Sequence, residues 1–329
     1  MMRHLSWAFA ICMVVAGCAF AADKSETFTD PANAGPDYAI QGEYKGEIKA
    51  EDQAVQVGTQ VIALGDGKFH GVFYIGGLPG EGWTRNDNKL EADSETKDGV
   101  VTFSGDGGSA KIADGKIAVF TPSGDLMGSL AKVDRKSPTL GAKPPVGATV
   151  LFDGTNTDAW QNGKIVDGNL LLANGTRTKQ DFQDFTFHIE FRTPFVPKAR
   201  GQGRGNSGVY LQNRYEVQVL DSFGLEGANN ECGGFYSIKE PAVNMCYPPL
   251  AWQTYDIDFT AARFEGDKKV KNAQVTVKHN GMTIYDHFEL PNLTPGGAPT
   301  EAPGRGPFML QAHGNPVTYR NIWVVEKKS

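Results

Sequence analysis

The side chains best suited to chemistry stand at alternate positions of short strand-like runs. In the run 185–192 the odd positions are apolar, and three even positions hold His188, Glu190 and Arg192. Because successive side chains of a β-strand point to opposite faces, these three groups share one face. A carboxylate beside an imidazole suits general acid–base catalysis or a divalent cation, and a guanidinium suits the holding of sugar hydroxyls.

Two later runs repeat this pattern. Their shared polar faces hold Glu216 and Gln218 in the run 215–220, and Gln311 and His313 in the run 308–313. If the three faces converge near the aromatic rings of Tyr236 and Trp252, they form a trough suited to a sugar. The alternative is the solvated face of an antiparallel sheet, although such a face usually carries Lys, Thr and Ser.

Nine strand-like runs in the second half of the chain must position these residues. They are 170–173, 185–193, 207–211, 215–220, 254–260, 272–279, 282–289, 308–312 and 318–326. Asn280-Gly281, between the sixth and seventh runs, is a strong signal for a two-residue hairpin. Nine strands in roughly 180 residues are typical of a two-sheet sandwich or jelly roll.

The first half of the chain also predicts β structure, in a separate small domain over residues 26–135. Its strand-like runs are 56–64, 69–75, 100–103, 116–120 and 126–133, separated by Gly and Asp. Residues 136–146, rich in Pro and Gly, predict a stiff linker, and 147–327 form the second domain. The fold class is therefore all-β, and the small domain has no predicted function beyond a structural or docking role.

The N-terminus predicts export. Arg3 precedes an apolar run and then small residues, which is typical of a signal peptide over residues 1–21. Cleavage before Ala22 would release the protein. If residues 15–18 are instead a lipobox, cleavage there would leave Cys18 lipidated at the new N-terminus. In either case the expected location is the periplasm or the outside of the cell.

Export bears on the two remaining cysteines, Cys232 and Cys246. In an oxidising compartment they predict one disulfide, which would close a loop and contribute about 3 kcal/mol. A catalytic thiol and a metal-binding pair are the alternatives, and the chain has no C-x-x-C spacing to support metal.

Composition excludes several classes of function. Asp and Glu number 38 against 32 Lys and Arg, without a basic patch, so nucleic acid is not an expected partner. Beyond the N-terminus no apolar run is long enough to span a membrane. Signatures of P-loop, zinc-protease and G-x-S-x-G chemistry are also missing from the sequence.

A series of motifs runs in order through residues 147–326. It comprises Leu151-Phe152-Asp153-Gly154, Trp160, 187–192, Asn206-Ser207-Gly208-Val209, Tyr215-Glu216-Val217-Gln218, Asp221, Gly233-Gly234-Phe235-Tyr236, Pro241, Trp252, Leu310-Gln311-Ala312-His313-Gly314 and Tyr319-Arg320-Asn321-Ile322. Together they resemble the 3-keto-disaccharide hydrolase domain, long catalogued as a domain of unknown function. The resemblance implies a concanavalin/laminin-G-like jelly-roll sandwich and leaves the N-terminal domain outside the match.

The resemblance also implies a reaction, the cleavage of glycosides that carry a ketone at C3. That ketone acidifies the C2 proton, and the leaving group at C1 is β to the resulting carbanion. The enzyme then needs a base near C2, an acid near the glycosidic oxygen and an electrophile for the enolate oxygen. Water addition to the enone completes a net hydrolysis.

On this basis Glu216 and His313 are the predicted acid–base pair, and Glu190 is a third catalytic group or a ligand. A divalent cation held by Glu190, Glu216 and His313 is the one cofactor considered. The predicted substrate-binding residues are Arg192, Asn206, Gln218, Gln311, Tyr236 and Trp252. The alternative function is a non-catalytic carbohydrate-binding module of laminin-G type, because this fold hosts both functions.

Overall fold

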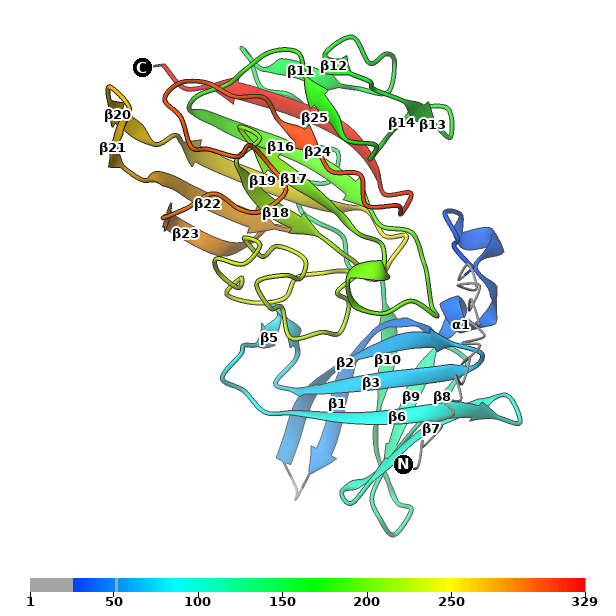
Figure 1. Cartoon of the computed structure of the whole chain (residues 1–329). Coiled ribbons are helices and arrows are strands. Elements are labelled where there is room, and N and C mark those ends of the chain that lie inside the picture. The colour runs from blue at the N-terminus through cyan, green and yellow to red at the C-terminus, as the bar shows by residue number, and fades with distance from the viewer. Residues whose placement is uncertain (1–25, 51–52, 329) are drawn as a thin grey trace, which may run out of the picture.

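A computed structural model describes residues 26–50 and 53–328 of the chain. The predicted signal segment and Cys18 lie outside these residues. The described chain is almost entirely β, which confirms the predicted class. Figure 1 shows a barrel built by the first part of the chain and a sandwich built by the rest. Within the described ranges, the helices are too short and too polar to cross a membrane.

Eight antiparallel strands close the barrel in the order β1-β10-β9-β8-β7-β6-β3-β2. Their bounds are β1 Gly42–Ala50, β2 Gln53–Gly65, β3 Lys68–Ile75, β6 Lys89–Lys97, β7 Val100–Gly105, β8 Gly108–Ala113, β9 Lys116–Phe120 and β10 Leu126–Val133. Because β1 pairs with both β2 and β10, the barrel has no free edge. Buried side chains, among them Tyr44, Phe69 and Leu130, fill its interior.

Short elements flank the barrel strands. A 3-10 turn, η1 (Pro31–Asn33), and a short helix, α1 (Gly35–Ile40), precede β1. Two-residue strands β4 (Leu78–Pro79) and β5 (Gly82–Trp83) lie between β3 and β6 and pair with each other.

The sandwich consists of an eight-stranded and a five-stranded sheet. The larger has the order β13-β14-β25-β16-β19-β22-β23, with β11 also pairing with β25. Its strands are β11 Thr149–Phe152, β13 Ile165–Val166, β14 Leu170–Leu172, β16 Phe185–Arg192, β19 Gln253–Thr260, β22 Ala273–His279, β23 Met282–Leu290 and β25 Thr318–Glu326. The smaller has the order β12-β15-β24-β17-β18, with β12 Trp160–Gln161, β15 Thr176–Thr178, β17 Ser207–Leu211, β18 Tyr215–Val219 and β24 Met309–Leu310. A 3-10 turn, η2 (Gly201–Gly203), precedes β17, and a separate hairpin pairs β20 (Arg263–Glu265) with β21 (Lys268–Lys271).

The core lies between the two sheets. Phe187 and Ile189 of β16 and Val217 of β18 are fully buried in it, and the ring of Phe187 stacks on that of Phe308 with 4.2 Å between centroids. The alternation read from the sequence therefore holds on both strands. We call the face of each sheet that is turned away from this core its outer face.

The predicted Asn280-Gly281 hairpin is confirmed. His279 of β22 pairs with Met282 of β23, and both turn residues have positive φ, 49° and 82°. These angles are those of a type I′ turn, in which Gly has no steric cost. A Cβ at Gly281 would lie 2.4 Å from Pro138, so the hairpin also packs closely against the segment that joins barrel and sandwich.

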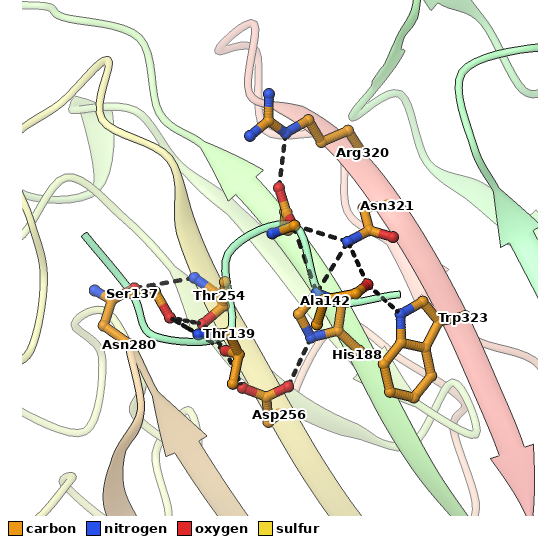
Figure 2. Close-up of polar contacts among 12 residues, drawn as sticks. Ser137, Thr139, Ala142, His188, Thr254, Asp256, Asn280, Arg320, Asn321 and Trp323 are labelled. Atoms are coloured by element: carbon orange, nitrogen blue, oxygen red, sulfur yellow. Dashed lines mark hydrogen bonds and ion pairs between the residues drawn. The ribbon is translucent and has the colours of Figure 1, made fainter. Parts of the chain in front are cut away.

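That segment is fixed along the outer face of the larger sheet over residues 137–142 (Figure 2). The Ser137 hydroxyl lies 2.6 Å from that of Thr254, and Thr139 donates to Asp256 at 2.6 Å. The backbone N–H of Gly141 donates to Glu190 at 2.6 Å. The sequence indicated a linker here, and about half of it is held by side chains of the sheet.

Barrel and sandwich also meet directly. The Arg204 guanidinium, bound to Asp221 at 2.6 Å, reaches the Ala63 carbonyl of β2 at 3.2 Å. Phe28 and Phe195 form a β-bridge across the same junction, and their rings are 5.9 Å apart. The contact between the two units is therefore both polar and apolar.

Candidate active site on the five-stranded sheet

The structure divides the predicted polar residues between two opposite outer faces. The apolar side chains of β16 and of β18 both enter the common core, so their polar side chains point away from each other. Glu190 and Arg192 therefore lie on the larger sheet, whereas Glu216 and Gln218 lie on the smaller one. The expectation of one converging trough is wrong, because strand alternation does not say which sheet a strand joins.

Glu190 is held in a hydrogen-bond network that includes the Gly141 N–H of the segment 137–142. Its carboxylate accepts hydrogen bonds from Arg320 at 2.7 Å and Asn321 at 2.8 Å, and its side chain is fully buried. Burial alone raises the pKa of this carboxyl, but hydrogen bonds, including those from His188, Asn321 and Arg320, lower it to about 2. Glu190 is thus ionised at neutral pH, binds the linker and does not join Glu216.

His188 belongs to the same network. Its Nδ1 lies 2.6 Å from Asp256, and its ring stacks on Trp323 with 5.0 Å between centroids. Burial lowers the pKa of His188, but hydrogen bonds and charge from Asp256 and Glu190 outweigh this and raise it.

Arg192 and Trp252 also lie on the larger sheet's side of the sandwich. The guanidinium of Arg320 is 3.9 Å from the Trp252 ring centroid, and that of Arg192 is 5.1 Å from it. These cation–π contacts occupy the indole that was predicted to stack on sugar. Neither residue contacts the Glu216 group.

Glu216 stands on the outer face of the smaller sheet, opposite Tyr210 in the register of β17 and β18. The Tyr210 hydroxyl lies 2.9 Å from Glu216 Oε2 and 2.6 Å from the Pro295 carbonyl, and Gln311 Nε2 donates to it at 3.3 Å. Glu216 is 2% exposed, and its Oε1 has no hydrogen-bond partner in the described part of the chain. A buried carboxyl oxygen without a partner is costly, so a group that brings a hydrogen-bond donor to it is favoured.

A glycine makes room for this carboxyl. A Cβ at Gly208 would lie 1.9 Å from Glu216 Oε1, so any larger residue at 208 displaces the carboxyl. From the other side, the Thr294 hydroxyl accepts the Glu216 backbone N–H at 2.7 Å. The segment from Thr294 to Gly296 therefore covers the carboxyl and Tyr210.

Burial sets the proton affinity of this group. It raises the pKa of Glu216 to about 7, although the hydrogen bond from Tyr210 partly lowers it. A carboxyl with a pKa near neutrality takes and returns protons efficiently at physiological pH. The geometry therefore suits Glu216 to general acid–base work.

Side-chain amides lie beside Glu216. Gln202 Oε1 accepts from Gln218 at 3.2 Å and from Asn206 at 2.9 Å, and Asn206 Oδ1 is buried without a partner among the described residues. Gln218 stands opposite Gly208 in the strand register, which places this amide chain next to the carboxyl. Such groups can hold sugar hydroxyls.

Tyr236 and His313 differ in how firmly they are held. Phe235 bridges Val217 and enters the core, so the following Tyr236 faces the Glu216 side. His313 is exposed in the segment after β24 and forms no hydrogen bond or ion pair with any described residue. The structure thus brings Glu216, Gln218, Gln311, Asn206 and Tyr236 together, while His313 lies two residues beyond Gln311 without an anchor.

Sequence reasoning missed Tyr210, Gln202 and the structural need for Gly208. Tyr210 and Gly208 were detectable, because the alternation in the predicted strand 207–211 places both on one face. Gln202 and the covering segment at 294–296 come from loops, and no sequence period indicates where a loop folds back.

No cluster of three or more His, Cys, Asp and Glu side chains suited to a metal is found in residues 26–50 and 53–328. The specific trio considered from the sequence, Glu190, Glu216 and His313, cannot hold one ion, because Glu190 is on the opposite face of the sandwich.

The predicted disulfide is wrong. Cys232 and Cys246 are free, buried thiols. Cys232 Sγ lies 3.3 Å from the Tyr255 hydroxyl, and Cys246 Sγ donates to the Leu220 carbonyl at 3.5 Å. Both ends of the loop are instead bound to Ser222, whose hydroxyl accepts the Cys232 N–H at 2.8 Å and whose carbonyl accepts the Asn244 amide at 2.8 Å.

Comparison with known proteins places this geometry in a family. No curated protein matches the chain. A candidate glycosyl hydrolase of Parabacteroides distasonis ATCC 8503, known from its crystal structure, is similar with 35% identity and a TM-score of 0.52 over 56% of this chain and 85% of that chain. Another from the same organism has 17% identity and a TM-score of 0.42 over 55% of this chain and 94% of that chain, too distant to carry an argument. The family model for the 3-keto-alpha-glucoside-1,2-lyase-like domain matches residues 147–325, more than half of the sequence, and the chain belongs to this family.

Proposed function

We propose that this chain cleaves glycosides whose sugar ring is oxidised to a ketone at C3, by elimination followed by hydration. The family and the similar P. distasonis protein support a carbohydrate-active role in general. The finer assignment rests on one observation, the buried carboxyl of Glu216 with an unpartnered Oε1 and a pKa near 7.

In the proposed reaction Glu216 takes the proton from C2. The electrons of the C2–H bond form the enolate of the C3 ketone, whose oxygen is stabilised by neighbouring donors such as the amides of Gln311 and Gln218. The enolate then collapses, a C1=C2 double bond forms, and the C1–O bond to the leaving group breaks. His313, near Gln311 in the chain, donates the proton that the leaving oxygen needs.

Hydration completes the reaction. The hydroxyl of a water molecule adds to C1 of the enone while the remaining water proton passes to His313, and protonated Glu216 returns a proton to C2. The sum is hydrolysis of the glycosidic bond without net oxidation or reduction. Because the carboxyl exchanges its proton with solvent between the two steps, the C2 hydrogen of the product comes from water.

The experiment is turnover of a 3-keto-disaccharide in deuterated water, followed by mass spectrometry and by the ultraviolet absorbance of the enone. We expect one deuterium at C2 of the released 3-keto-sugar. Release of sugar without deuterium would instead indicate direct displacement at C1 and refute the elimination route.

Variants of the proposed catalytic residues, with an exposed carboxyl as control, test which side chains carry out the reaction. Glu216→Gln should lower turnover by about 10²- to 10⁴-fold, and His313→Ala should lower it within the same range. Glu289→Gln, an exposed carboxyl on β23 of the other sheet, should leave it unchanged. Binding of the keto-sugar without turnover by the unmodified protein would favour a non-catalytic carbohydrate-binding module.

We also propose that the protein is exported, since residues 1–21 have the pattern of a signal peptide. The intact mass of the mature protein from a bacterial host tests this. A chain that begins at Ala22 indicates release, a lipidated Cys18 indicates an anchor, and an uncleaved N-terminus contradicts export.

A further inference from the structure

A cavity opens where barrel and sandwich meet, away from the Glu216 group. It measures about 390 Å³, within the range of small-molecule sites, and junctions between domains are common places for such sites. Its walls come from α1, the start of β1, the end of β10 and the loop around residues 248–251. None of the side chains assigned to the Glu216 group lines it.

Gln41 lines this cavity, and its side-chain amide N–H makes no hydrogen bond with the described residues. Its side chain is 3% exposed, and its Oε1 accepts the Ala63 N–H at 3.0 Å and faces Arg204 at 3.5 Å. Its Nε2 has no hydrogen-bond partner among the residues the structure describes. A buried amide N–H without a partner is costly, so a ligand that brings an acceptor to it is favoured.

Both cationic side chains of the cavity lining, Arg135 and Lys132, already donate hydrogen bonds within the protein. Arg135 donates to both carboxylate oxygens of Glu43, at 2.5 and 2.7 Å, and to the Pro79 carbonyl at 2.8 Å. Lys132 donates to the Ala39 carbonyl. Glu43 neutralises Arg135, and the carboxylate of Asp134 lies near enough to Lys132 to balance part of its charge, so the described lining selects only weakly for an anionic ligand.

The remaining wall combines polar and apolar surface. Asp134 is exposed and accepts no hydrogen bond from any described residue, so it is available as an acceptor for a hydroxyl. Pro248, Ala251 and the half-buried ring of Tyr38 provide apolar surface. A pyranose matches such a wall, because its C–H face is apolar and its hydroxyl rim both donates and accepts.

We propose that this junction cavity binds a neutral sugar unit, and so is a second carbohydrate site besides the one around Glu216. Sugar hydroxyls accept from Gln41 Nε2 and donate to Asp134, while the ring lies against Pro248 and Ala251. Both units of the chain contribute to the site, which gives the barrel a role in holding carbohydrate.

Calorimetric titration of the full-length mature protein with sucrose, maltose and trehalose tests this. These unoxidised sugars are not substrates of the proposed reaction, so the test is independent of turnover. Ala251→Phe fills the cavity without removing a hydrogen bond. Gln41→Glu keeps an acceptor for Ala63 and Arg204 but replaces the free donor with a second acceptor.

We expect at least one disaccharide to bind, and each variant to weaken this binding at least tenfold. Turnover of a 3-keto-disaccharide should be unchanged, with thermal unfolding showing that the variants are folded. Gln218→Ala, in the Glu216 group, should leave this binding intact. The proposal is overturned if no neutral disaccharide binds, if Gln218→Ala rather than Ala251→Phe removes binding, or if glucuronate binds more tightly than the neutral sugars.

Discussion

Replacement of Glu216 by Gln should stabilise the protein at alkaline pH while it removes activity. In the folded chain the pKa of this carboxyl rises from its usual 4.5 to about 7, because the group is buried. At about 1.4 kcal/mol for each pKa unit, ionised Glu216 costs about 3 kcal/mol of stability. Glutamine keeps an oxygen that can accept from Tyr210 but carries no charge, so the variant avoids this cost.

The pH dependence follows from the sign of the shift. Below about pH 4 the carboxyl is protonated in both the folded and the unfolded chain and contributes nothing. As the pH rises from 4.5 through 7, only the unfolded chain ionises freely, so the unmodified protein loses stability relative to the variant. Above about pH 8 the difference is constant.

Urea unfolding of both proteins at about pH 4 and about pH 8 measures this difference. We expect a gain for Glu216→Gln of about 3 kcal/mol at the higher pH and a small difference at the lower pH. Glu289→Gln, on an exposed edge strand, should follow the unmodified protein at both values. An equal effect of Glu216→Gln at both pH values would refute the assignment of a buried, proton-binding carboxyl.

Three further predictions concern the surroundings of this site. Gly208→Ala should lower turnover by about 10²-fold, because the added Cβ displaces the Glu216 carboxyl from its position. Steady-state kinetics measure this, and unchanged activity would contradict the need for Gly at position 208. Glu190→Gln should lower the free energy of unfolding by about 3 kcal/mol at neutral pH, since the folded pKa of Glu190 is about 2, with turnover per folded molecule retained. This stability is present above pH 4.5 and is lost as the pH falls toward 2, and a loss of activity at full stability would place Glu190 in the chemistry instead. Limited proteolysis with a nonspecific protease should first cut the exposed residues 143–146 rather than the bound residues 137–142, as peptide mass mapping can show, and a first cut within 149–326 would contradict it.

Much of the sandwich could be predicted from the sequence, because apolar side chains recur at alternate positions along its strands. The runs 207–211 and 318–326 match β17 and β25 residue for residue, and the Asn280-Gly281 turn lies where expected. Strands without such a pattern were not predicted. β6 alternates charged residues with small or apolar ones, β1 is rich in Gly, Lys and Glu, and β8 consists mainly of small residues. Pairing with their neighbours holds all three in the barrel, and no local period reveals that pairing.

The site could be predicted only in part, for the same physical reason. Alternation correctly placed Glu216 and Gln218 on a polar face, since it depends only on a strand's own residues. It placed Glu190 on a polar face equally well, but whether two strands lie in one sheet or in opposite sheets is decided by long-range pairing. The linker over Glu190, the free thiols of Cys232 and Cys246, and the burial that raises the pKa of Glu216 all depend on segments far apart in the sequence, and so only the tertiary structure decided them.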